Sequence, residues 1–200
     1  MNFLAHVYLA TPTPEGWCGG LLGDFVKGTV PDDLPRPMGE NILLHRRIDR
    51  FTDDHPVFRR SRALVRPDYR RYAGIMVDLF YDHFLASHWQ RFSHRPLDRF
   101  TGEVYAALHQ HRERFPPRLQ RMLPYMIGDD WLGGYARLDG IERALQGLSR
   151  RLRRANPLAD GIRELEAHYE SFESQFLEFF PAAIVYAGKH LSAEPRQAAG

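Results

Sequence analysis

Apolar residues recur at helical spacing along almost the whole chain, and this pattern constrains the fold more than any other feature. In nearly every long segment they fall at positions i, i+3, i+4 and i+7, without the sustained alternation typical of a half-buried strand. The 200 residues contain no Ser/Gly-rich or charge-rich linker, and 44% of them are hydrophobic, enough for one well-buried core. The sequence therefore predicts an all-α fold: a compact, multi-helix single domain over residues 1–200, with a loose tail at 191–200.

The periodicity and its proline and glycine breaks also predict where the helices lie. Asn2 and Asp68 are the expected N-caps of the first and fifth helices. The fifth helix is apolar around most of its circumference, so it should be central and buried. Glycines in and before the second helix should allow close backbone approach: Gly16, Gly19, Gly20 and Gly23. The expected helices cover residues 2–10, 17–27, 39–52, a short stretch from 56, 69–89, 97–114, 118–132, 139–152, 158–180 and 182–190.

The third predicted helix carries three possible metal ligands spaced four residues apart. At about 3.6 residues per turn, His45, Asp49 and Asp53 form one stripe. Imidazole and carboxylate groups together suit a divalent ion such as Mn²⁺, Fe²⁺ or Zn²⁺. Arg46 and Arg47 cover a neighbouring arc, and guanidinium groups bind phosphate well. This combination indicates metal-assisted phosphoester chemistry.

The central helix carries three more titratable residues, and burying them without partners would cost free energy. Asp78 and Asp82 lie four residues apart and would face the His45 stripe if the two helices packed side by side. His83 falls near the middle of the apolar face, where one hydrogen bond satisfies a histidine more often than a metal does. We treat Asp82 and His83 as candidate ligands, with the hydrogen-bonded alternative left open for His83.

Two further candidate ligands lie near the amino terminus. His6 falls on the first predicted helix, and Asp24 lies in a short turn-like segment. Asp24 could instead cap a turn or pair with Lys27. Four separate segments nevertheless each carry a histidine or aspartate among apolar neighbours. A single bound cation would offset the cost of burying all of them, which is a simpler explanation than a separate partner for each.

The charge distribution is uneven although the formal net charge is only +2. Nine arginines lie between residues 45 and 72, against four aspartates. This segment is either a docking surface for an acidic partner or a solvated helix face.

The one cysteine, Cys18, excludes an internal disulfide and fits a reducing compartment. The first ten residues resemble neither a signal peptide nor a membrane span, so we expect a cytoplasmic protein without a membrane partner.

Several segments, in order and at similar spacing, resemble those of one known family. The chain is similar to the bacterial acyl carrier protein phosphodiesterases, also called holo-acyl-carrier-protein hydrolases. One departure is Gly20, where the family pattern has asparagine, so a contact made by that side chain is in doubt here. The segments are Met1–His6, Gly23–Gly28, His45–Asp49 with Thr52 and Asp53, Asp82–Leu85 with His88 and Trp89, Trp131–Leu132, Ala167–Tyr169, Phe176 and Phe179–Pro181.

The resemblance implies an HD-like helical core with a divalent metal site, in which manganese is favoured and Mg²⁺, Fe²⁺ or Zn²⁺ would serve. It implies removal of the 4'-phosphopantetheine arm from a serine of acyl carrier protein, a reaction linked to fatty acid biosynthesis. Because such carrier proteins are acidic, the arginine-rich segment, including Arg59 and Arg60, becomes the expected docking surface. The expected metal ligands are His6, Asp24, His45, Asp49, Asp82 and His83.

In the expected mechanism the metal ion lowers the pKa of a bound water, which then attacks phosphorus. Arg46, Arg47 or Lys27 would stabilise the developing negative charge, and Asp53, Asp78 or a metal-bound water would protonate the leaving serine oxygen. Two alternatives remain open: an HD-type phosphohydrolase acting on a nucleotide or another small phosphodiester, and a non-enzymatic basic adaptor. No nucleic-acid partner is expected for the favoured function, and the sequence indicates no particular oligomeric state.

Overall fold

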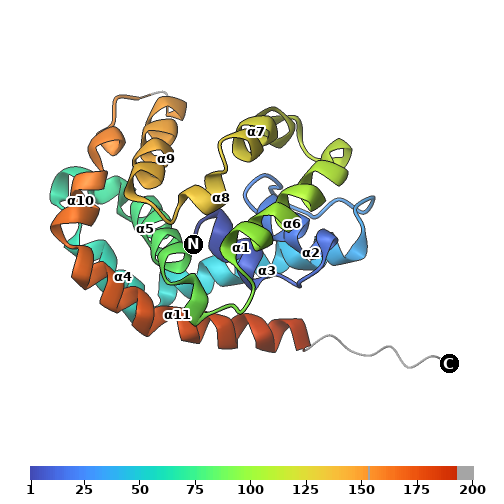
Figure 1. Ribbon diagram of the computed structural model, residues 1–200, viewed down its shortest axis with the longest axis horizontal. Coiled ribbons are helices and arrows are strands. Elements are labelled where there is room, and N and C mark those ends of the chain that lie inside the picture. The colour runs from blue at the N-terminus through green and yellow to red at the C-terminus, as the bar shows by residue number, and fades with distance from the viewer. Residues whose placement is uncertain (153, 193–200) are drawn as a thin grey trace.

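The computed structural model describes residues 1–152 and 154–192, and within these ranges it contains helices and no strands (Figure 1). The prediction of an all-α chain is confirmed. Among the described residues, no helix is both long enough and apolar enough to cross a membrane. The α-helices are α1 Phe3–Leu9, α2 Pro14–Leu22, α3 Arg36–Asp54, α4 Pro56–Leu64, α5 Ala73–Ser87, α6 Leu97–Gln110, α7 Pro117–Gly128, α8 Trp131–Gly134, α9 Leu138–Arg151, α10 Ile162–Ala167 and α11 Tyr169–Ser192. Short 3₁₀ helices are η1 Pro67–Tyr72, η2 Trp89–Arg91, η3 Arg112–Arg114 and η4 Leu158–Asp160.

Helix α5 is the central element, as its apolar circumference predicted. Phe80 and Phe84 are fully buried, whereas Ile75 at its start is exposed. The long helix α11 runs along one side of the molecule and packs against α3, α4 and α5 (Figure 1). Its phenylalanines are fully buried, and several of their rings contact the rings of α5 and α3: Phe172, Phe176, Phe179 and Phe180.

Three predicted helix boundaries are wrong. Asp68 does not cap the central helix, because residues 67–72 form the 3₁₀ helix η1 and α5 begins only at Ala73. The predicted helix 158–180 is interrupted near His168, where α10 ends. Pro181 does not end a helix: α11 continues through it, and burial of its neighbours offsets the lost backbone hydrogen bond. Residues 191 and 192 still belong to α11, and the rest of the predicted tail lies outside the described residues.

Glycines in α2 allow this helix to pack very closely against its neighbours. A Cβ atom on Gly19 would lie 2.3 Å from the carbonyl oxygen of Met38 in α3. A Cβ on Gly16 would lie 2.1 Å from the carbonyl oxygen of Thr11. Real Cβ atoms do not approach other atoms so closely, so both contacts need glycine. The predicted close approach is confirmed, and it places α3 beside the first two helices of the chain.

Candidate metal centre

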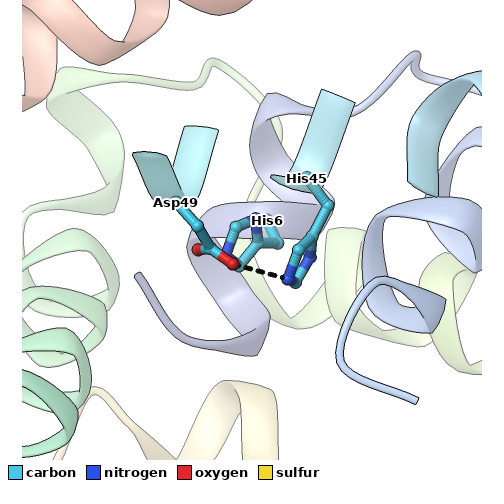
Figure 2. A group of neighbouring side chains, drawn as sticks. All are labelled: His6, His45 and Asp49. Atoms are coloured by element: carbon cyan, nitrogen blue, oxygen red, sulfur yellow. Dashed lines mark ion pairs between the residues drawn. The ribbon is translucent and has the colours of Figure 1, made fainter. Parts of the chain in front are cut away.

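Two helices that are well separated in the sequence, α1 and α3, bring His6, His45 and Asp49 together (Figure 2). The Nε2 atom of His6 lies 3.0 Å from Oδ1 of Asp49, and the Nε2 atom of His45 lies 3.1 Å from Oδ2. The two imidazole rings stack with their centroids 3.5 Å apart. Both histidines are buried, while the side chain of Asp49 is 43% exposed. The cluster therefore combines two nitrogen donors with a carboxylate that solvent can reach.

The hydrogen bonding of His45 leaves its outer nitrogen directed at a carboxylate. Its Nδ1 atom lies 2.7 Å from the carbonyl oxygen of Gly20, and a carbonyl only accepts, so Nδ1 carries the proton. In the neutral ring, Nε2 then presents a lone pair to Asp49. Two lone pairs 3.1 Å apart repel each other unless a proton or another cation lies between them. Metal-binding histidines commonly donate their second ring N–H to a carbonyl in this way.

The protonation of the other two members also suits a metal ion. Burial, together with the neighbouring ring of His45, lowers the pKa of His6 to about 3, so this ring is neutral at pH 7. Burial alone would raise the pKa of Asp49, but contacts with His45 and His6 hold it far below its usual range. The Nδ1 atom of His6 is buried and has no hydrogen-bond partner. The Nε2 atom of His6 also lies 3.0 Å from the carbonyl oxygen of Met1, which only accepts, so in the metal-free protein Nε2 carries the proton. A neutral His6 beside an ionised carboxylate fits a divalent cation if this proton moves to Nδ1.

Asp24 lies at the edge of this cluster. Its Oδ1 atom is 3.8 Å from Nε2 of His45, and its side chain is 44% exposed. Burial raises the pKa of Asp24, and the nearby His45 and Lys27 oppose that rise. Arg46 fixes the following segment, because its guanidinium donates to the carbonyl oxygens of Val26 and Gly28. Arg46 therefore supports the Asp24 turn, whereas the sequence predicted that it would contact phosphate.

The first residues of the chain lie between α3 and α5. The α-amino group of Met1 is 2.7 Å from Oδ1 of Asp78 on α5 and 3.8 Å from Oδ1 of Asp49 on α3. Burial alone would lower the pKa of this amine, but Asp78 and Asp49 raise it to about 10. Asp78 and the His45 stripe were predicted to face each other directly. Instead they meet across the buried ammonium group of Met1.

Asp82 is fully buried and binds the start of α1. Its two carboxylate oxygens accept from the backbone N–H groups of Leu4, at 2.7 Å, and Ala5, at 3.1 Å. Burial raises the pKa of Asp82 to about 7, although these two hydrogen bonds oppose the rise. Asn2 makes no side-chain cap, so that prediction is wrong: a carboxylate from α5 replaces it. Asp82 positions α1, and through α1 it positions His6.

His83 has partners of its own away from the cluster. Its Nδ1 atom lies 2.8 Å from the carbonyl oxygen of Tyr135, and its Nε2 atom lies 2.9 Å from the hydroxyl of Tyr169. Both ring nitrogens are therefore engaged by protein groups. This is the hydrogen-bonded alternative that the sequence left open, and the structure does not bring His83 to the predicted metal ligands.

Three other candidates lie on the surface. Arg47 and Lys27 are exposed, and Lys27 is near enough to influence the charge of Asp24. Asp53 continues the α3 stripe one turn beyond Asp49, with a side chain that is 68% exposed and lies 4.0 Å from Arg62. Of these three, Lys27 has the most direct electrostatic link to the cluster.

The sequence did not reveal two groups that shape the centre: the carbonyl of Gly20 and the ammonium group of Met1. Gly23 was predicted to allow close approach, and it does, since a Cβ atom there would lie 2.2 Å from Cγ of His45. A Cβ on Gly20 would itself lie 3.0 Å from the carbonyl oxygen of His6, so a larger residue there would have to shift its surroundings. The positions of backbone carbonyl and amino groups cannot be predicted from the order of residue types. The glycines around the second helix nevertheless indicated that this region would pack closely.

Fold and site together define an all-helical protein with a buried histidine–aspartate cluster suited to a metal ion. The family profile described as acyl carrier protein phosphodiesterase matches residues 1–183. The chain belongs to the acyl carrier protein phosphodiesterase family, as its resemblance indicated.

Curated relatives carry the same description. The "Acyl carrier protein phosphodiesterase" of Enterobacter sp. (strain 638) is 36% identical over 188 residues, which cover 94% of this chain and 97% of the relative. That of Salmonella paratyphi A is 37% identical over 190 residues, which cover 94% of this chain and 98% of the relative. The Salmonella newport (strain SL254) protein gives the same identity and coverage. No solved structure matches.

Proposed function

We propose that this protein is a metal-dependent phosphodiesterase that converts holo acyl carrier protein to apo acyl carrier protein and 4'-phosphopantetheine. The names of its relatives support the substrate. The observation that carries the metal dependence is the convergence of His6 Nε2 and His45 Nε2 on the carboxylate of Asp49, at 3.0 and 3.1 Å. Two imidazoles favour Mn²⁺, Fe²⁺ or Zn²⁺ over Mg²⁺, which prefers oxygen ligands. Ligands drawn from separate helices also fit the proposed HD-like core.

His6, His45 and Asp49 would hold the ion, with Asp24 at its open side. When bound, a divalent ion supplies charge stabilisation for the phosphodiester and a nucleophile derived from water. The protein's own cations, of which Lys27 is best placed, would offset the charge that develops on the phosphate oxygens. Asp78 or Asp53 would deliver a proton to the leaving serine oxygen.

Mass spectrometry of holo acyl carrier protein tests this function directly. We expect the carrier protein to lose the mass of the arm when it is incubated with the metal-loaded protein, and 4'-phosphopantetheine to accumulate. A chelator should stop the reaction, and added Mn²⁺ should restore it. Hydrolysis of small nucleotide phosphodiesters, with the carrier protein left intact, would favour the broader HD-type alternative. Binding of the carrier protein without any hydrolysis would favour the adaptor.

The arginines predicted to dock the carrier protein already pair with acidic neighbours. Arg59 Nη2 lies 3.2 Å from Asp54, and Arg60 forms an ion pair with Glu178. Such pairs reduce the net positive potential that this face offers to an acidic partner.

A second group of arginines lies on α7 and at the end of α9, and one of them contacts the segment next to Asp24. Arg118 lies over the ring of Phe25, the residue after Asp24, at 5.7 Å from its centroid. Within residues 1–152 and 154–192, no acidic side chain forms an ion pair with Arg118, Arg121 or Arg151. The open side of the centre and these unpaired charges favour this face as the docking surface for the acidic carrier protein.

Charge reversal can compare the two faces. Arg118→Glu with Arg121→Glu should lower kcat/KM for the carrier protein at low salt by about tenfold or more, because like charges oppose association. The matched pair Arg59→Glu with Arg60→Glu changes the net charge equally and should have a smaller effect. Both variants should be measured across a salt series with their metal content checked. A larger loss of kcat/KM in the Arg59/Arg60 variant would instead identify the face predicted from the sequence as the docking surface.

A further inference from the structure

A cavity of about 440 Å³ lies between the start of the chain, α5, α8 and α9. Ligand sites in proteins commonly measure roughly 300–1,000 Å³, so this cavity is large enough for a small organic group. Its walls are largely apolar, but five charged residues also line it: Asp129, Asp130, Arg143, Arg150 and Arg151. The residues that line it include Asn2, Leu79, Trp131, Tyr135, Ala144 and Gly147.

One wall of the cavity adjoins the metal centre. Asn2 follows Met1, whose amine pairs with Asp78, and Leu79 follows Asp78 on α5. The side-chain amide of Asn2 donates to the hydroxyl of Tyr135 at 3.2 Å, so two polar groups stand at this end. Figure 1 shows the N-terminus in the middle of the molecule, near α5 and α8. A ligand in the cavity would therefore have one end near the ion pair of Met1 and Asp78, whose ammonium group lies 3.8 Å from Oδ1 of Asp49.

The opposite wall is a helix face with very small side chains. Gly140, Ala144 and Gly147 recur along one side of α9, and all three line the cavity. A Cβ atom on Gly147 would have no neighbour within 4 Å, so open space lies directly against the helix backbone. Trp131 provides an aromatic side to the cavity, with Arg151 lying over its ring at 5.4 Å. Open space beside the α9 backbone and one aromatic wall suit a flexible chain better than a broad ring system.

We infer that this cavity holds the 4'-phosphopantetheine arm of the carrier protein while its phosphodiester lies at the metal centre. This inference rests on the proposed function. The arm is a flexible chain without rings: next to its phosphate it carries a dimethyl-substituted carbon and a hydroxyl, and two amides follow along its length. Its phosphate must lie near His45 and Asp49 for hydrolysis. Asn2 and Tyr135 then supply hydrogen-bonding groups for the amides, while α9 supplies the apolar wall for the chain.

The test uses pantetheine, which lacks the phosphate and so reports on the cavity separately from the metal centre. Gly147→Leu should fill the cavity and weaken pantetheine binding by at least about tenfold in calorimetry, because a filled cavity cannot be packed further without strain. The same variant should raise KM for holo carrier protein, with metal content and Tm retained. The fold should tolerate leucine here because its Cβ meets open space and leucine favours helix.

Two control variants separate size from other effects. Gly147→Ala adds a single methyl group and should bind pantetheine more tightly than Gly147→Leu does. Gly102→Leu makes the same exchange on α6, at a helical glycine that also has open space and lies outside the cavity. It should behave as the unaltered protein.

The outcomes distinguish this inference from the proposed function. If Gly147→Leu binds pantetheine and hydrolyses holo carrier protein with unchanged affinity and KM, the cavity does not hold the arm, and the phosphodiesterase function stands. If the unaltered protein binds pantetheine in a Gly147-dependent manner but releases no arm from the carrier protein, the cavity assignment is supported and the proposed reaction fails.

Discussion

Asp49→Asn should lose metal binding and should also make the metal-free fold less stable, because contacts with His45 and His6 favour the ionised carboxylate in the folded state. The carboxylate is the only group that contacts both His6 Nε2 and His45 Nε2 among the described residues, at 3.0 and 3.1 Å. Because removal of outer-shell partners alone costs about 10–100-fold in metal affinity, we expect this exchange to cost at least about 100-fold.

Metal titration and calorimetry check both parts of this expectation. Metal at about 100 times its Kd should stabilise the unaltered protein by about 2.7 kcal/mol, and the same concentration should leave the Tm of Asp49→Asn almost unchanged. Carrier-protein hydrolysis should fall in step with metal occupancy. Asp54→Asn is the matched control, since Asp54 is exposed on the same helix and pairs with Arg59. Full metal occupancy and normal turnover in Asp49→Asn would exclude the proposed centre.

The sequence predicted the parts of this centre that depend on helix periodicity. His45 and Asp49 share one face of α3 because four residues make about one helical turn, and the structure places both in the same cluster. The glycines around α2 predicted close packing, and that packing brings the carbonyl of Gly20 to His45.

The sequence could not predict which buried polar groups would pair with each other. Asp82 and His83 are neighbours on α5, yet the first binds the amides of α1 and the second bonds Tyr135 and Tyr169. That difference follows from which segments pack on each side of the helix, which residue types alone do not determine. The ammonium group of Met1 is a further case, because a terminal amine has no periodicity to reveal its burial.

Gly23→Ala should weaken the metal centre although it removes no donor. Gly23 has φ −51° and ψ −34°, a backbone conformation that alanine adopts readily, so the effect is purely steric. The added Cβ would lie 2.2 Å from Cγ of His45, and the ring must move to relieve the overlap. We expect a loss of metal affinity of about 100-fold, similar to the loss of a ligand, with about 1–3 kcal/mol of destabilisation from overpacking.

A double-mutant cycle with His45→Ala tests whether this steric contact is direct. In the unaltered background, Gly23→Ala should lower the free energy of unfolding of the metal-free protein. In the His45→Ala background the colliding ring is absent, so the same exchange should be neutral or stabilising, and the two changes should be strongly non-additive. Gly102→Ala is the control, because its Cβ meets nothing within 4 Å, and it should stabilise the helix slightly in both backgrounds. An equal destabilisation by Gly23→Ala in both backgrounds would mean that Gly23 acts on the backbone of the Asp24 turn, not on the ring of His45.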